Sequence, residues 1–142
     1  MQKKNLYTRG SHACFKLLYH LVLVTRYRHP VVKDDLEKSL KEYTAIYLKN
    51  NNRTLIEMES NMDHIHILFE TSPNVNLANL ISGLKTNSSR VIRNRFQKEL
   101  AAYYWKPCFW SKSCFICSFG HNTEEIVANY IKNQKQFIFN CG

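Results

Sequence analysis

The stretch "NMDHIHILFE", residues 61–70, carries the pattern that decides the fold. From His64 onward its residues alternate, so in a β-strand His64, His66 and Leu68 face one side. The other side carries three apolar side chains that a hydrophobic core would cover: Ile65, Ile67 and Phe69. The stretch therefore predicts a strand over residues 64–70 with one apolar face and one histidine face.

Upstream of this strand, the chain predicts a strand, a helix and a second strand. "HLVLVTRYR" (20–28) is β-branched and is closed by Pro30, which is typical of a strand. Residues 34–50 have an acidic start and an apolar stripe at helical spacing: Leu36, Leu40, Tyr43 and Tyr47. "TLIEME" (54–59) alternates, which predicts a strand paired as a hairpin with residues 64–70. One face of that strand would carry Thr54, Ile56 and Met58.

Downstream, a helix, a strand and a last helix are expected. The first helix begins at Asn76 and has an apolar face made of Leu77, Leu80, Ile81, Leu84, Val91 and Ile92. Its charge is carried by Lys85, Arg90, Arg93, Arg95 and Lys98. Residues 109–119 predict a strand, and the last helix starts at "HNTEEI", where Asn122 or Thr123 can cap it. It continues through "VANYIKNQKQ".

The order of these elements is β-α-β-β-α-β-α. This order favours an α+β fold, with a ferredoxin-like or RRM-like antiparallel sheet and helices on one face. A chain of 142 residues with 44% hydrophobic residues is expected to form a single domain over residues 1–142.

Charge and composition favour a polyanionic partner. The net charge is +9, and residues 1–33 contain no acidic side chain. Eight tyrosines and two tryptophans offer surfaces on which unpaired bases could stack. No apolar run reaches the roughly 18 residues that span a bilayer, and no secretory signal is apparent. We therefore expect a cytoplasmic protein with reduced cysteines and no membrane partner.

His64 and His66 are candidate metal ligands. At i and i+2 of a strand their Cα atoms lie about 6.7 Å apart, so both imidazoles can lean toward one ion. An exposed strand face also tolerates histidines without function, and a site needs a third ligand. A zinc site from Cys108, Cys114, Cys117 and His121 is disfavoured, because an offset of three in a strand places Cys114 and Cys117 on opposite faces. Core cysteines are the better interpretation.

In the last predicted helix, Tyr130 and Gln134 are four residues apart and share a face. Alone, such a pair is usually a half-buried surface contact. Together with the histidine strand and three further segments, however, it forms a recognisable series. The segments, in order, are "YHLVLVTRYRHPVV", "DHIHIL", "GLKTNSSRVI", "FWSKSCF" and "YIKNQ". This series resembles the HUH single-tyrosine transposases of the insertion-sequence 200/605 type (TnpA-type), nearly end to end.

The resemblance implies an enzyme, a DNA strand transferase and endonuclease. It makes Tyr130, on the C-terminal helix, the nucleophile, and makes His64, His66 and Gln134 the ligands of a divalent cation, Mg²⁺ or Mn²⁺. The tyrosine would attack single-stranded DNA, leaving a 5′-phosphotyrosine and a free 3′-OH for rejoining. The resemblance also implies recognition of a DNA hairpin at the element's ends, and a homodimer whose subunits share active sites.

Five basic residues are candidates for DNA-backbone contacts: Lys85, Arg90, Arg93, Arg26 and Arg28. Solvated charge is nearly as good an explanation for any one of them. Two alternatives remain open at this point. One is a relative that cuts repeat-derived hairpins without mobilising an element (a REP-associated tyrosine transposase), or another HUH nicking enzyme. The other is a non-catalytic, single-stranded nucleic-acid-binding module with a ferredoxin-like fold.

Overall fold

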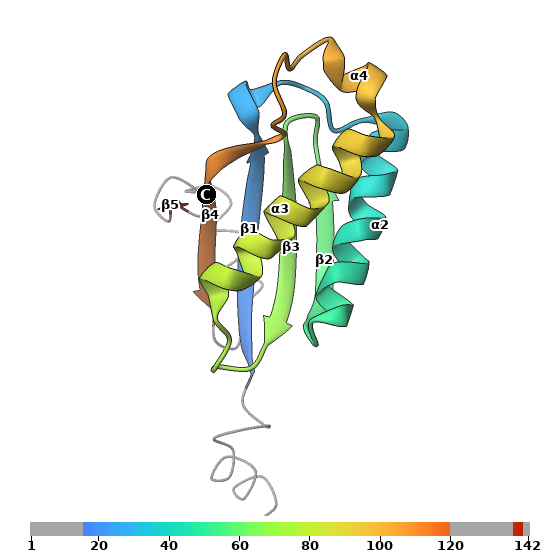
Figure 1. Cartoon of the computed structure of the whole chain (residues 1–142). Helices are drawn as coiled ribbons and strands as arrows, with labels where there is room; N and C mark the ends of the chain where they lie inside the picture. The colour runs from blue at the N-terminus through green and yellow to red at the C-terminus, as the bar shows by residue number, and fades with distance from the viewer. Residues whose placement is uncertain (1–15, 120–137, 141–142) are drawn as a thin grey trace, which may run out of the picture.

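An antiparallel sheet with helices against one face forms the framework of the protein (Figure 1). The computed structural model describes residues 16–119 and 138–140. The strands are β1 (Leu17–Thr25), β2 (Thr54–Ser60), β3 (His64–Thr71), β4 (Trp110–Phe119) and β5 (Ile138–Asn140). The helices are α2 (Asp34–Asn50), α3 (Leu77–Arg95) and α4 (Gln97–Ala101), preceded by the 3-10 turn η2 (Arg26–Arg28).

The strands lie in the order β2-β3-β1-β4-β5, and each neighbouring pair is antiparallel. The two long helices α2 and α3 cross the same face of the sheet (Figure 1). This arrangement confirms the predicted α+β fold of the ferredoxin-like kind. The expected C-terminal helix, which begins at Asn122 or Thr123, lies outside the described residues.

Local sequence explains where the long helices start. Asp34, Asp35 and Glu37 lie in the first turn of α2, where their charges suit the positive end of the helix dipole. Asn76 caps α3, because its side-chain oxygen accepts a hydrogen bond from the Asn79 N–H at 3.1 Å. Both starts agree with those predicted.

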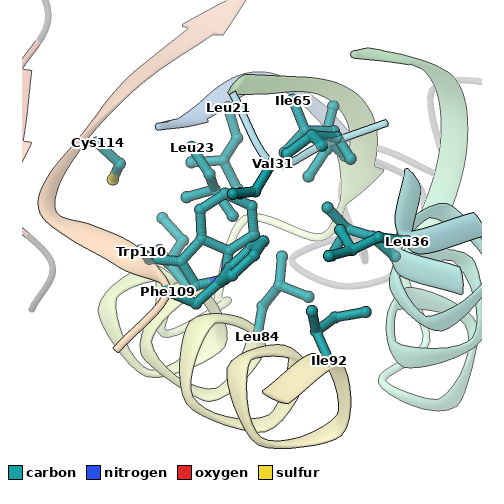
Figure 2. Close-up of a cluster of buried hydrophobic side chains, with 14 of the residues drawn as sticks. Leu21, Leu23, Val31, Leu36, Ile65, Leu84, Ile92, Phe109, Trp110 and Cys114 are labelled. Carbon is teal, nitrogen blue, oxygen red and sulfur yellow. The ribbon is translucent and has the colours of Figure 1, made fainter. Parts of the chain in front are cut away.

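The main core lies between the sheet and the two long helices (Figure 2). Ile65, Ile67 and Phe69 of β3 have exposed fractions of 0%, which confirms the predicted apolar face of this strand. In Figure 2, Leu36 of α2 and Leu84 of α3 point into the same cluster. Each fully buried side chain of this size contributes roughly 1.5–3 kcal/mol. This packing fixes the other face of β3, with its histidines, on the side away from the helices.

Strand β1 ends earlier than the sequence predicted. Its strand pairing runs from Leu17 to Thr25, not from His20 to Arg28. Tyr27 and Arg28 have φ angles of 58° and 55°, which are incompatible with a strand. The chain therefore turns at η2, and this turn carries Arg26 and Arg28 to different sides.

The predicted faces of β2 and α2 need correction. A bulge between Leu55 and Glu57 shifts the alternation of β2, so Leu55 and Met58 pack against the core while Ile56 is exposed. In α2 the buried stripe continues from Leu36 and Leu40 through Thr44 and Leu48, and the two predicted tyrosines are only partly buried. Thr44 tolerates burial because its hydroxyl donates to the Leu40 carbonyl at 2.8 Å.

The described cysteines pack in two clusters. Cys114 belongs to the main core and Cys117 to a small cluster around Val22 on the opposite face, as the offset of three predicted. Cys108 and Cys117 are free thiols, but Cys114 is disulfide-bonded, so the expectation of reduced cysteines is wrong for Cys114.

Candidate active site

His64 and His66 lie on the face of β3 opposite to the one covered by α2 and α3. Their neighbours on β1 are Val24 and Val22. The two imidazole ring centres are 4.8 Å apart and the ring planes meet at 72°. Both side chains are half-buried, so one face of the pair is available to a ligand. This separation is compatible with one ion between the two rings, and the metal site stays a prediction.

The Nδ1 atom of each of these rings already has a partner. His64 Nδ1 lies 2.7 Å from Asp63 Oδ1, and His66 Nδ1 lies 3.3 Å from His20 Nε2. In metal sites such contacts fix the tautomer and the ring orientation. With Nδ1 engaged, Nε2 is the nitrogen that each ring presents to an ion.

His20 is a site residue that the sequence did not single out. It lies on β1 opposite Leu68 and is 3% exposed. Its ring stacks on that of His66, with centres 5.3 Å apart. Burial, and secondarily the charge of His66, lowers the pKa of His20 to about 4, so its ring is neutral at pH 7. Only the pairing of β1 with β3, which the sequence does not reveal, could have identified it.

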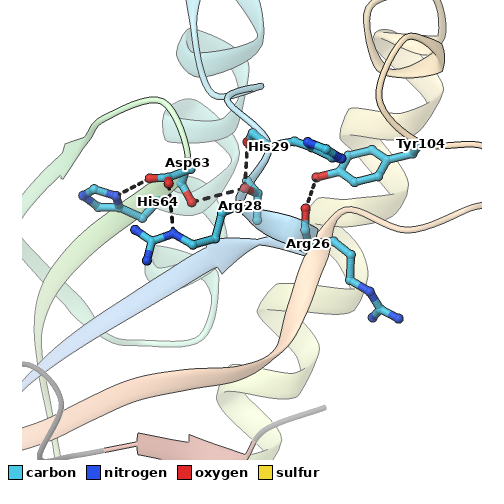
Figure 3. A network of polar contacts seen from close by, with 7 residues as sticks. Arg26, Arg28, His29, Asp63, His64 and Tyr104 are labelled. Atoms are coloured by element: carbon cyan, nitrogen blue, oxygen red, sulfur yellow. Dashed lines mark hydrogen bonds and ion pairs between the residues drawn. The ribbon is translucent and has the colours of Figure 1, made fainter.

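Asp63 connects His64 to the turn η2 (Figure 3). Its second carboxylate oxygen accepts a hydrogen bond from Arg28 Nε at 3.0 Å. Partial burial alone would raise the pKa of Asp63, but the hydrogen bonds of His64 and Arg28 outweigh it and the pKa is lowered. Its backbone carbonyl accepts from the Thr25 N–H at 2.9 Å. The result is an ionised carboxylate fixed beside His64.

The turn that presents Arg28 is held from several sides. The Tyr104 hydroxyl donates to the Arg26 carbonyl at 2.9 Å, and the Thr25 hydroxyl donates to the His29 carbonyl at 2.8 Å. Burial raises the pKa of Tyr104 to about 12, so this donor stays protonated. Positive φ angles at Tyr27 and Arg28 cost of order 1–3 kcal/mol each, which these contacts offset. In Figure 3 the Arg28 side chain points toward Asp63, and the Arg26 side chain points away from it.

A basic groove of about 420 Å³ lies between α3 and the start of β4. Four cationic side chains and no acidic one are among the described residues that line it: Arg26, Lys85, Arg93 and Lys112. Three of the five predicted DNA contacts thus meet in one place, and Lys112 is an addition. The other two candidates are not among the lining residues: Arg28 pairs with Asp63, and Arg90 contacts Asn87 on the surface of α3.

Lys85, one of the residues that carry the charge of α3, is buried. It is 7% exposed, and its Nζ donates to the Ser111 carbonyl at 2.7 Å. Burial, and secondarily the charge of Arg26, lowers the pKa of Lys85 to about 8. A carbonyl on the neighbouring strand explains why this position of α3 accepts a buried lysine.

Tyr130 and Gln134 lie outside the described residues, so their predicted positions are not tested. Within residues 16–119 and 138–140, no three His, Cys, Asp or Glu side chains form a metal-binding group. This part of the chain therefore offers two imidazoles for an ion, and any third ligand comes from elsewhere. Separately, no helix in this part is long and apolar enough to cross a membrane.

Comparison with known proteins assigns the family. A family model described as "Transposase IS200 like" matches residues 13–134. The chain belongs to the IS200-like transposase family. The ISDra2 transposase TnpA of Deinococcus radiodurans is 27% identical over 126 residues, covering 89% of each chain. The transposase for insertion sequence element IS200 of Salmonella typhimurium is 27% identical over 124 residues, covering 87% of this chain and 80% of the relative.

The fold of this IS200-like transposase agrees with a solved structure. A crystal structure from Deinococcus radiodurans R1, described as that of a transposase, superimposes with a TM-score of 0.71 and 28% identity. The match covers 88% of this chain and 95% of the other. Family and fold together identify a DNA-processing protein, and the elements that carry the site, β1, η2, β3, α3 and β4, all lie within the matched residues.

Proposed function

We propose that this IS200-like transposase cuts and rejoins single-stranded DNA through a covalent bond to Tyr130. The observation that carries the proposal is the oriented pair His64 and His66, whose Nδ1 atoms are engaged by Asp63 and His20. Histidines held in this way are suited to bind an ion through Nε2.

A divalent cation, Mg²⁺ or Mn²⁺, would be held by His64, His66 and Gln134. Two imidazoles and an amide are neutral ligands, so the ion keeps its full charge for a phosphate. Few protein ligands also leave coordination positions open. When bound, the ion would contribute charge that stabilises the phosphate oxygens during the reaction.

Tyr130 would perform the covalent step. Its phenolic oxygen attacks phosphorus and loses its proton, and the bond from phosphorus to the 3′-oxygen of the preceding nucleotide breaks. The products are a 5′-phosphotyrosine and a 3′-OH, and the reverse attack by another 3′-OH rejoins DNA without an external energy source. Tyr47 and Tyr104 are less suited as nucleophiles. Burial raises their pKa values, and their hydroxyls donate hydrogen bonds to backbone carbonyls.

The DNA partner would lie along the basic groove, in contact with Arg26, Lys85, Arg93 and Lys112. A groove lined by four cations favours phosphates irrespective of sequence. The proposal also includes recognition of a DNA hairpin and a homodimer whose subunits share active sites. These parts rest on the family resemblance. A mixed dimer of Tyr130→Phe and His64→Ala subunits tests the sharing, since it regains activity only if Tyr130 acts across subunits.

Cleavage of a single-stranded oligonucleotide carrying the element's own end tests the function. Wild-type protein should cleave it with Mg²⁺ or Mn²⁺, and neither chelator-treated protein nor the His64→Ala/His66→Ala variant should. The Tyr130→Phe variant should bind the strand without cleaving it. Cleavage that persists without both histidines contradicts the metal assignment. Binding without any cleavage by the wild type favours a non-catalytic binding module.

A further inference from the structure

An aromatic cluster surrounds the turn η2 next to the basic groove. The ring of His29 lies 5.3 Å from the rings of both Tyr103 and Tyr104. Tyr27 lies 5.8 Å from His29 and 6.5 Å from Tyr104. Trp105 follows Tyr104 directly in the chain. Tyr27, His29, Tyr103 and Tyr104 thus form one aromatic surface, and Trp105 adjoins it along the chain.

Two aromatic side chains of this region, Tyr27 and Trp105, are unusually exposed. Trp105 is 85% exposed and Tyr27 is 59% exposed, the two largest exposed fractions among the large hydrophobic side chains in the described part of the chain. Single exposed apolar residues are ordinary on protein surfaces. Here, however, Tyr27 belongs to the aromatic cluster, Trp105 directly follows the cluster member Tyr104 in the chain, and each exposed ring has a cation beside it. Arg26 lies 5.4 Å from the Tyr27 ring centre and Lys106 lies 5.3 Å from that of Trp105.

The aromatic surface continues into the basic groove. Arg26, whose guanidinium lies over Tyr27, is also a lining residue of the groove. At the other side, Pro107 and Cys108 line the groove only two and three residues after Trp105. Exposed rings next to a row of cations form the combination that binds single strands, because phosphates follow the charge and bases stack on the rings.

We propose that Trp105 is a stacking platform for an unpaired base of the DNA strand whose phosphates occupy the groove. This inference rests on the proposed function, since it specifies the form of its DNA substrate. A base in a duplex presents only its edges, whereas an unpaired base presents the flat face that an exposed indole requires. The platform therefore selects unpaired nucleotides without selecting their sequence.

The test compares two probes: a short thymidine oligonucleotide, and an abasic oligonucleotide of the same length with the same phosphates. Affinities are measured for full-length wild type, Trp105→Ala, Trp105→Phe and, as the control, Ile46→Ala, which removes a 55% exposed apolar side chain from α2. Stacking of one base is worth roughly 1–3 kcal/mol, so Trp105→Ala should weaken thymidine binding about 5- to 140-fold. It should leave abasic binding unchanged, and Trp105→Phe should retain most of the affinity.

Fluorescence gives a second readout from the same proteins. The chain has two tryptophans, and Trp110 is 6% exposed with its indole N–H bonded to Ser88. Thymidine oligonucleotide should therefore quench the wild type and not Trp105→Phe. The platform is wrong if Trp105→Ala loses affinity for both probes equally, or for neither of them. If the wild type binds neither probe, both the platform and the proposed function are overturned. Cleavage assays test the proposed function and not the platform.

Discussion

Replacing Asp63 with alanine should weaken metal binding while leaving the fold intact. The change removes the carboxylate that contacts His64 Nδ1 at 2.7 Å and Arg28 Nε at 3.0 Å. The Arg28 side chain is 69% exposed, so the loss of its ion pair should affect stability little. The backbone carbonyl of residue 63, which holds Thr25, remains in the variant.

The size of the effect follows from what the carboxylate does. A partner that orients a ligating histidine is typically worth 10- to 100-fold in metal affinity, or roughly 1.4–2.7 kcal/mol. Asp63→Asn keeps an acceptor oxygen at nearly the same position, so its loss should lie at the lower end of this range. Because His20 still contacts His66, neither variant should abolish binding.

Calorimetric titration of Mn²⁺ into the full-length proteins measures these affinities. Glu57→Gln is the matched control, because it removes an exposed carboxylate from the neighbouring strand β2. Nitrogen-15 spectra of His64 report the tautomer, which should be protonated on Nδ1 in the wild type and mixed in Asp63→Ala. If Mn²⁺ affinity is the same in Asp63→Ala as in the wild type while His64→Ala has lost it, the orienting role is wrong.

Two further predictions concern Lys85 and Gly83. The Lys85 pKa of about 8 means that its ammonium loses its proton as pH rises from 7 to 9, so DNA affinity should fall over this range in the wild type. The DNA affinity of Lys85→Arg should fall much less, because arginine stays charged over this range. Gel shifts in which both proteins lose affinity in parallel with pH would contradict the role of Lys85. A Cβ at Gly83 would meet the hydroxyl of Tyr47, which donates to the Leu80 carbonyl. In a Tyr47→Phe background, Gly83→Ala should thus raise the free energy of unfolding by about 1 kcal/mol, and in the wild-type background by clearly less. Equal effects of Gly83→Ala in both backgrounds, measured by urea unfolding, would refute the contact.

The sequence predicted those features that depend on one segment at a time. The alternation around His64 and His66 is a property of one strand, and it correctly separated the core face from the histidine face. Helix α2 was predicted with its observed bounds because its acidic start and its apolar spacing agree. Local patterns suffice where a single element determines which side chains are buried.

Features that depend on contacts between segments were missed. His20 joins His66 only because β1 pairs with β3, and Lys85 is buried because Ser111 on β4 accepts its hydrogen bond. The bulge at residues 55–57 moved Ile56 to the surface, against a regular alternation. The ion pair between Asp63 and Arg28, a candidate DNA contact, likewise joins two separate segments. No pattern within one segment contains these contacts.

The central claim, covalent catalysis by Tyr130, is tested most directly by mapping the protein–DNA adduct. Wild-type protein is incubated with its single-stranded end and Mn²⁺, boiled in detergent and digested, and the modified peptide is identified by mass spectrometry. The account predicts one phosphotyrosine-linked nucleotide, on Tyr130, and no adduct in Tyr130→Phe. An adduct on another of the eight tyrosines, or cleavage of the strand with no adduct at any of them, would contradict it.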